Sequence, residues 1–206
     1  PYTAGSTQLI HILPPECQEG GLERLSENLR EPAFRAGLRR RMETGSDFEN
    51  ISLLVGWENI VASSVTRQEN KIYEGKSIAE IAAMQGKDPF DCAFDLLAEE
   101  NCAVSMIDFI AAEEDIEAIL RDETTCVISD STYPTQGLLH PRVYGTYARL
   151  FERYVRERKT IPADKAVQKV TSLPAKRLGL AGKGTVAVGM DADLNVFRLE
   201  DLHEAG

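Results

Sequence analysis

The alternation of helical and strand patterns in the middle of the chain restricts the fold more than any other feature of the sequence. Residues 103–109 form an apolar run interrupted only by Ser105 and Asp108, which predicts a strand buried on both faces. A helical pattern over residues 113–121 follows, and a shorter apolar run over residues 124–129 predicts a second buried strand. This order is typical of parallel α/β structure, so we expect an α/β fold.

Two helices with well-marked N-termini precede the first of these strands. Ser77 and Glu80 have the spacing of a capping box, in which each side chain accepts a hydrogen bond from the other residue's backbone N–H. Asp88 and Pro89 provide an N-cap and a first-turn proline for the next helix. The apolar residues of that helix recur at spacings of four and three, which predicts one buried face carrying Phe90, Phe94 and Leu97.

The patterns on either side of this region are less regular. Residues 1–21 are rich in Gly, Pro, Ser and Thr and are predicted to form a loop, and residues 22–43 to form a helix. Residues 51–65 predict a strand, interrupted near Gly56. Towards the other end, an irregular loop leads to a helix predicted over residues 145–158.

The sequence pattern changes from helical to strand-like after about residue 183. Residues 184–189 and 192–197 are two short strand patterns separated by Gly189, Met190 and Asp191. We expect the two patterns to form strands.

Composition argues against several classes of partner and site. The formal net charge is −10, and because phosphate binding requires a basic face, no nucleic-acid partner is expected. No apolar run approaches the roughly 20 residues that a membrane-spanning helix needs, so no membrane partner is expected either. The four cysteines form no CxxC pair, and we interpret them as reduced thiols of a cytoplasmic protein.

Short motifs follow one another in order along nearly the whole chain. They are Pro1-Tyr-Thr-Ala-Gly-Ser-Thr7, Glu74-Gly-Lys-Ser-Ile-Ala-Glu-Ile-Ala82 with Gly86-Lys-Asp-Pro89, Ala103-Val-Ser-Met106, Ser129-Asp130 with His140-Pro-Arg142, and Thr171-Ser-Leu-Pro-Ala175 with Gly189-Met-Asp-Ala-Asp-Leu194. Single motifs are unspecific, but the ordered set resembles the N-acyl-D-amino-acid deacylases, or D-aminoacylases, of the amidohydrolase superfamily.

The resemblance implies a TIM-like (β/α)8 barrel with a small β-sandwich, of which this chain is the C-terminal part. Residues 1–70 are then the lid or insertion after the sixth barrel strand. Residues 71–172 are the last barrel strands and helices, and residues 173–206 are C-terminal strands of the β-sandwich. A complete barrel needs about 250 residues, so the first six strands are expected to be missing.

The same resemblance implies a zinc site that this chain does not complete. The family holds zinc with an HxH motif, a Cys and further histidines, whereas this sequence has no HxH, and His11, His140 and His203 lie in the wrong segments. Zinc is therefore expected in the full-length enzyme and not in the isolated fragment, which we expect to be inactive because one carboxylate cannot hold zinc without its partners.

Asp130 is the strongest catalytic candidate. It ends the predicted strand 124–129 and opens a long loop, and barrel enzymes carry their chemistry at that end of the strands. The resemblance implies that Asp130 contacts the metal and acts as general base; read from position alone, it is equally well a helix or turn cap. Ser131 stands where the family usually has Gly, so the geometry after Asp130 is expected to differ.

Three further residues are candidates for substrate binding. The resemblance implies that Arg142 binds the substrate's α-carboxylate, since a guanidinium grips a carboxylate with two parallel hydrogen bonds; the alternative is a surface Arg at a helix start. His140 either contacts substrate or orders the loop. Ser6 matches a family position near the substrate, although by sequence alone it is a polar loop residue.

The resemblance implies a hydrolase that cleaves the amide bond of N-acyl-D-amino acids, with an N-acyl-D-amino acid as its small-molecule partner. Residues 1–23 contain no Lys or Arg, which favours a neutral or hydrophobic substrate side chain. Two alternatives stay open: another amidohydrolase acting on cyclic amides, such as a dihydroorotase-like or hydantoinase-like enzyme, and a non-catalytic binding module. An apolar face left bare by missing strands is expected to cause self-association of the fragment.

Overall fold

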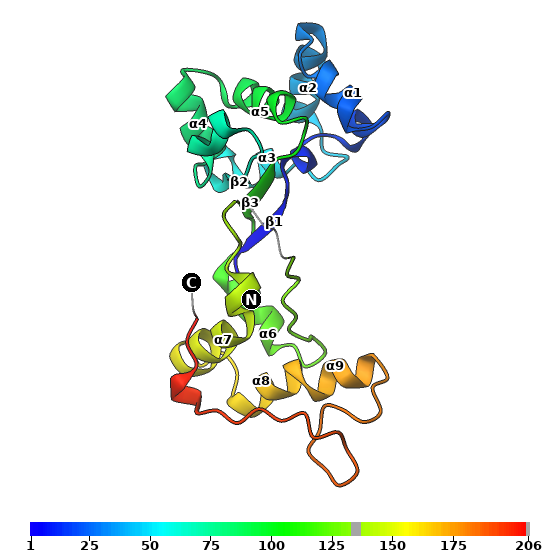
Figure 1. Cartoon of the computed structure of the whole chain (residues 1–206), viewed down its shortest axis with the longest axis vertical. Coiled ribbons are helices and arrows are strands. Elements are labelled where there is room, and N and C mark those ends of the chain that lie inside the picture. Colours follow the sequence, from blue (N-terminus) through cyan, green and yellow to red (C-terminus); the bar gives the residue numbers. More distant parts are fainter. Residues whose placement is uncertain (133–136, 205–206) are drawn as a thin grey trace. The chain divides into compact units, whose positions relative to one another are not determined.

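The computed structural model describes residues 1–132 and 137–204, which divide into two compact units. We call residues 4–110 with 137–140 the sheet unit, and residues 1–3, 111–132 and 141–204 the helical unit (Figure 1). The chain is α/β, as predicted, and the strands lie in the sheet unit. Among the described residues, no helix is long and apolar enough to cross a membrane.

The sheet within the described residues has the order β1-β3-β2. Its strands are β1 (Ala4–Gln8), β2 (Ile60–Ser64) and β3 (Ser105–Phe109), and both pairings are antiparallel. The strand predicted over residues 103–109 is confirmed as β3, but the expectation of a parallel sheet is wrong. Residues of β3 alternate in burial, with Met106 and Asp108 inside, so this strand is not buried on both faces.

Helices and 3₁₀ turns complete the sheet unit. They are η1 (Leu9–Ile12), η2 (Pro15–Gln18), α1 (Leu22–Asn28), α2 (Pro32–Thr44), α3 (Ile51–Val55), η3 (Trp57–Asn59), η4 (Gln68–Tyr73), α4 (Ile78–Gln85) and α5 (Pro89–Glu99). Helix α5 packs against both α1 and α4 and contributes Phe94 and Leu97 to the core, each almost fully buried.

Local signals in the sequence set several of these boundaries. The capping box forms as predicted: Glu80 N–H donates to Ser77 Oγ at 3.1 Å, and Ser77 N–H donates to Glu80 Oε2 at 2.7 Å. Gly86 ends α4 in a left-handed conformation with a φ of 63°, which glycine adopts without steric cost. Asp88 caps α5 by accepting a bond from Phe90 N–H at 2.9 Å.

Three expectations for the first 65 residues need correction. The predicted loop 1–21 contains β1, because residues 4–8 pair with β3 as an antiparallel strand. The helix predicted over 22–43 is two helices, since Pro32 starts α2 afresh after α1 has ended. The strand predicted over 51–65 exists only from Ile60; its first part is α3, capped by Asn50.

The helical unit packs short helices around its own core. Its elements are α6 (Glu113–Arg121), α7 (Arg142–Arg149), the π-helical segment η5 (Leu150–Glu157), α8 (Ala163–Val170), α9 (Ser172–Arg177) and η6 (Leu199–Asp201). The helix predicted over 145–158 corresponds to α7 and η5 together. Core residues are Leu120, Val127, Leu150, Phe151, Tyr154, Ile161 and Ala166.

The predicted second buried strand, residues 124–129, is wrong. These residues are described and form no strand, although Val127 N–H donates to Lys169 O at 3.2 Å and Val127 is buried. In the described part of the helical unit no other strand lies beside them to complete a ladder. Val127 packs into the core of the helical unit, whereas Ile128 is 68 % exposed, so the apolar run is only partly buried.

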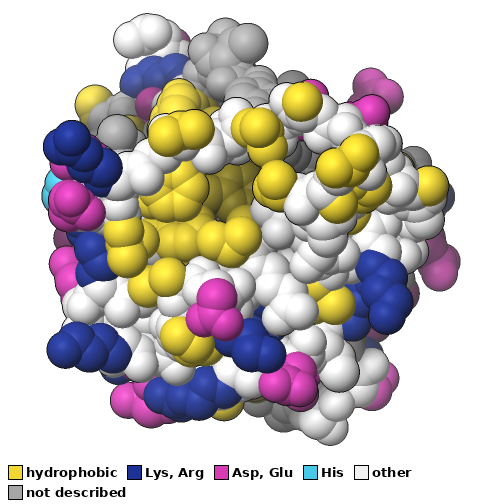
Figure 2. Space-filling view, turned by 90° about the horizontal axis from the view of Figure 1, so that it is seen from below, with side chains coloured by type: hydrophobic (Ala, Val, Ile, Leu, Met, Phe, Trp, Pro, Cys, Tyr) yellow, Lys and Arg dark blue, Asp and Glu magenta, His cyan; other side chains and the backbone are white. Residues whose placement is uncertain are grey.

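The strands predicted over 184–189 and 192–197 are also absent from the described residues. Val186, Val188 and Val196 are almost fully exposed, because within this part of the chain no neighbouring strand pairs with them. Figure 2, which views the chain from the side of α8, α9 and this tail, shows hydrophobic side chains gathered around a hollow. Phe197 is partly covered by Phe151, with ring centroids 5.7 Å apart.

Candidate functional site

Asp130 and Arg142 lie together in the helical unit. Asp130 Oδ2 is 3.1 Å from Arg142 Nη1, and the two residues are separated by a loop of which residues 133–136 lie outside the described part. The Asp130 side chain is 75 % exposed, whereas that of Arg142 is only 17 % exposed. The pair therefore presents a carboxylate to solvent against a largely buried guanidinium.

The backbone around this pair is shaped by Asp130 itself. Its φ of 48° lies in the left-handed region, which Asp tolerates better than most residues. The next residue, Ser131, donates its hydroxyl to Arg142 O at 3.0 Å, and Thr146 donates to the same carbonyl at 2.8 Å. Arg142 is the first residue of α7, so these bonds are made at the start of that helix.

His140 and Ser6 lie in the sheet unit. His140 is buried, and its Nε2 bonds to Ala4 O at 3.0 Å; because a carbonyl only accepts, the ring nitrogen is the donor. Ser6 is half-buried on β1, opposite Ile107 of β3. Ala4 and Ser6 are two positions apart on β1, so their side chains share a face of the sheet.

Asp108 is a buried carboxylate that the sequence-based reasoning did not select. It lies on β3 opposite Gly5, and a Cβ added at Gly5 would come within 2.7 Å of Asp108 Oδ1. Glycine is therefore required at position 5 if the carboxylate is to keep its place. A signal was present in the sequence, since Asp108 is the one charged residue of the apolar run 103–109.

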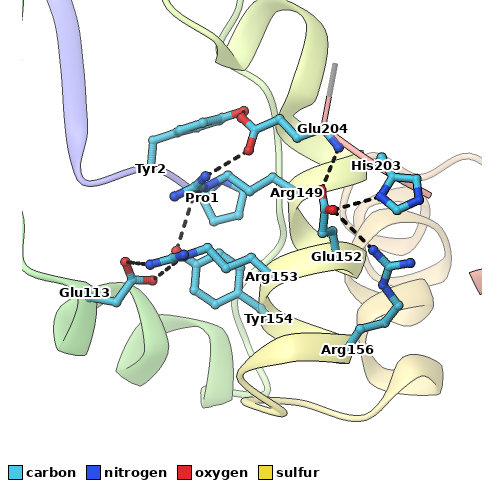
Figure 3. Close-up of polar contacts among 10 residues, drawn as sticks. All are labelled: Pro1, Tyr2, Glu113, Arg149, Glu152, Arg153, Tyr154, Arg156, His203 and Glu204. Carbon is cyan, nitrogen blue, oxygen red and sulfur yellow. Dashed lines mark hydrogen bonds and ion pairs between the residues drawn. The ribbon is translucent and has the colours of Figure 1, made fainter. Parts of the chain in front are cut away.

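A second polar network in the helical unit connects residues far apart in the sequence (Figure 3). Arg149 Nη1 is 2.8 Å from Glu204 Oε2, the Tyr2 hydroxyl donates to the same carboxylate, and the Arg149 guanidinium lies 4.6 Å from the centre of the Tyr2 ring. Glu152 accepts bonds from His203 Nδ1 at 2.9 Å and from Glu204 N–H at 2.7 Å.

Glu113 and Arg153 belong to the same network and connect α6 to η5. The two N–H···O bonds between them are 3.2 and 2.8 Å long, and they lower the pKa of Glu113 from 4.5 to about 2. Burial, followed by hydrogen bonding to Glu113, raises the pKa of Tyr154 to about 12. Each of the three carboxylates in this network forms an ion pair with an arginine: Glu113, Glu152 and Glu204. Such pairs indicate a structural role, which is to hold the elements of the helical unit together.

The described residues of this chain gather no metal site among themselves. Within residues 1–132 and 137–204 there is no group of three or more His, Cys, Asp or Glu side chains placed to hold a metal ion. The carboxylate of Asp130 faces Arg142, and within the described part of the chain it belongs to no such group. Zinc generally needs at least three protein ligands, so Asp130 is at most one member of a larger set.

Comparison with known proteins gives a consistent result. The model of the family described as "Amidohydrolase family" matches residues 11–205. N-acyl-D-glutamate deacylase and D-aminoacylase of Alcaligenes xylosoxydans xylosoxydans are 38 % and 37 % identical to the chain over 123 residues. That alignment covers 60 % of this chain and 24 % of each relative, so the chain matches about a quarter of their length.

The fold leads to the same group of proteins. The structure of N-acyl-D-glutamate deacylase from Bordetella bronchiseptica, solved with zinc and a phosphonate mimic of the tetrahedral intermediate, superposes with a TM-score of 0.64 at 26 % identity. The superposition covers 94 % of this chain and 31 % of that one.

Proposed function

We propose a function for this chain from the premise that it belongs to the amidohydrolase family. In this proposal the chain supplies Asp130 and Arg142 to the active site of a hydrolase. That hydrolase cleaves N-acyl-D-amino acids into a carboxylate and a D-amino acid. The observation that carries the proposal is the ion pair itself. It places a proton-accepting carboxylate 3.1 Å from a guanidinium suited to a carboxylate ligand. The chemistry of such a substrate needs both groups.

Arg142 is proposed to bind the α-carboxylate of the substrate. Its guanidinium is largely buried, which strengthens its interaction with an anion relative to bulk water. Because the group is planar with parallel N–H donors, it also orients the carboxylate that it binds. Orientation of the substrate about this contact would present the acyl carbonyl in one direction and so favour one enantiomer.

Asp130 is proposed as general base and then general acid. It takes a proton from the water whose oxygen attacks the acyl carbon, and it returns a proton to the amide nitrogen as the C–N bond breaks. The 75 % exposure of its side chain leaves the carboxylate accessible to water and substrate. Ser6 and His140 are proposed as further substrate contacts on the ground of the family resemblance, and the bond from His140 Nε2 to Ala4 O fixes the imidazole ring on β1.

The proposal includes zinc, whose other ligands would come from outside this sequence. The support is that the Bordetella bronchiseptica relative was solved with zinc, while the described residues of this chain gather no metal-ligating group. We therefore expect this chain alone to be inactive even with added zinc. Turnover of N-acetyl-D-methionine by the purified chain would contradict that expectation.

The location proposed for this activity is the cytoplasm. All four cysteines lie among the described residues and are free thiols, two of them buried. Burial raises the pKa of Cys92 to about 11, so this thiol stays protonated and unreactive at neutral pH. A reducing compartment suits such a set of thiols.

A substrate panel on the full gene product that carries this sequence tests the proposed function. We expect zinc-dependent hydrolysis of N-acetyl-D-methionine, slower hydrolysis of N-acetyl-D-glutamate, and little of the L-enantiomers, dihydroorotate or hydantoin. Asp130→Asn should lower kcat by about 10²- to 10⁴-fold because the proton acceptor is lost. Faster turnover of the cyclic amides would make the proposed substrate class wrong, and an active Asp130→Asn enzyme would remove Asp130 from the mechanism.

A further inference from the structure

We propose that Ser131 is a positioning residue for Arg142, and through it for the α-carboxylate of the substrate; this assignment rests on the proposed function. Ser131 Oγ donates to the backbone carbonyl of Arg142 at 3.0 Å, across the loop that separates the two residues. The adjacent Asp130 contacts the side chain of the same arginine. Arg142 is thus held at its backbone and at its guanidinium by two consecutive residues.

The left-handed turn at Asp130 makes this double contact possible. In extended backbone the side chains of consecutive residues point to opposite sides. Here the φ of 48° at Asp130 breaks that alternation, and both Asp130 and Ser131 reach Arg142. The strained conformation costs roughly 1 kcal/mol, so the contacts that follow from it have to compensate for that cost.

The bond from Ser131 reaches the start of α7 from outside that helix. Its N-cap residue is Pro141, and no side-chain cap bond is made there. Thr146 also bonds to Arg142 O, but it lies four residues along the same helix and therefore cannot fix the helix to the loop. Ser131 therefore supplies a bond that joins the Arg142 carbonyl to a residue outside α7.

The consequence is specific to substrate binding. Removing the Ser131 hydroxyl frees the first residue of α7, while the charge of the guanidinium and the carboxylate of Asp130 both remain. Binding through the α-carboxylate then weakens equally in the ground state and the transition state, which raises KM and leaves kcat nearly unchanged. A net hydrogen bond of this type corresponds to about a fivefold effect.

The first test is kinetic and uses the full gene product that carries this sequence. Ser131→Ala should raise KM for N-acetyl-D-methionine about fivefold, and Ser131→Thr, which keeps the hydroxyl, should restore it. Thr132→Ala is the matched control, because Thr132 is the exposed neighbour and its hydroxyl makes no bond within the described residues. Wild-type turnover reports on the proposed function, and the ratio of KM values reports on Ser131.

A double-mutant cycle separates positioning from general stability. If Ser131 acts through Arg142, adding Ser131→Ala to Arg142→Ala should change KM no further. If Ser131→Ala raises KM equally in both backgrounds, or only lowers the melting temperature, Ser131 is a structural residue and the inference is overturned.

The last test does not depend on turnover. In the ¹⁵N spectrum of arginine side chains of this chain, the Arg142 Nε–H signal, assigned with Arg142→Lys, should shift or broaden in Ser131→Ala and stay in place in Thr132→Ala. An unchanged Arg142 signal in Ser131→Ala would overturn the assignment even if the enzyme proved to have another substrate.

Discussion

The Arg142 side chain is largely buried, whereas that of its ion-pair partner Asp130 is largely exposed, and this difference decides what substitutions of Arg142 will do. Its partner Asp130 remains open to solvent, so a second carboxylate can approach the pair from the exposed side. In the proposed function that carboxylate belongs to the substrate. The contact depends on a flat, forked donor rather than on positive charge alone.

We expect Arg142→Lys to raise KM for N-acyl-D-amino acids by tenfold or more with a smaller change in kcat. Lysine keeps the charge but loses the two parallel donors that orient a carboxylate. Arg142→Ala should be weaker still. Steady-state kinetics of the full gene product measure this, with an N-acyl amine that lacks the carboxylate as control substrate. Equal effects on both substrates would show that Arg142 does not contact the carboxylate.

At the scale of elements, the helical unit is held together by charged contacts between helices as well as by its apolar core. The bidentate Glu113–Arg153 pair joins α6 to η5, and Arg158 adds a second cation near Glu113. These side chains are only partly exposed, which favours a larger contribution than that of an ordinary surface pair.

The pH dependence of stability follows from the lowered pKa of Glu113. A folded-state pKa of about 2, against 4.5 for the unconstrained group, means that the pair stabilises the fold above pH 4.5. This contribution is lost as the pH falls towards 2. We expect Glu113→Gln to lower the free energy of unfolding by roughly 1 kcal/mol at pH 7, and the difference from wild type to disappear near pH 2.

Urea denaturation at several pH values measures this difference. Glu123→Gln is the control, because Glu123 lies in the same unit but its side chain is 83 % exposed. Its ion pair with Lys165, at 3.4 Å, is therefore an ordinary surface pair. A Glu113→Gln effect that is independent of pH would contradict the assigned cause.

At the scale of the whole molecule, the chain carries much apolar surface that its own described residues leave uncovered. Val186, Val188 and Val196 are the extreme cases, and Leu178 and Leu194 are also exposed. Exposed apolar surface of this kind is unusual in a monomeric soluble protein. The chain matches about a quarter of the length of its curated relatives, in which more protein is present to cover such a surface.

We therefore expect the isolated chain to self-associate, with its mean size by light scattering increasing with protein concentration and with salt. Replacing Val186, Val188 and Val196 by Ser should reduce the association, because these side chains make up exposed apolar area and little of the core. A matched triple change at the polar, exposed positions Glu114, Lys176 and Glu200 should leave it unaltered. A monomer at all concentrations would contradict the prediction.

The sequence by itself determined the features that depend on near neighbours in the chain. The capping box at Ser77 and Glu80 and the cap at Asp88 form as predicted, because their partners lie within four residues. The ordered motifs also led to the correct family, and the family resemblance selected Asp130 and Arg142, which the structure brings together.

Only the tertiary structure decided which strands exist and how they pair. The runs 103–109 and 124–129 have similar apolar patterns, yet of the two only the first forms a strand. β1 and β2 pair with it, while of residues 124–129 only Val127 enters a core cluster. Likewise, the bond from Ser131 to Arg142 depends on the left-handed turn at Asp130. Strand pairing and loop closure join residues that are distant in sequence, so no local pattern specifies them.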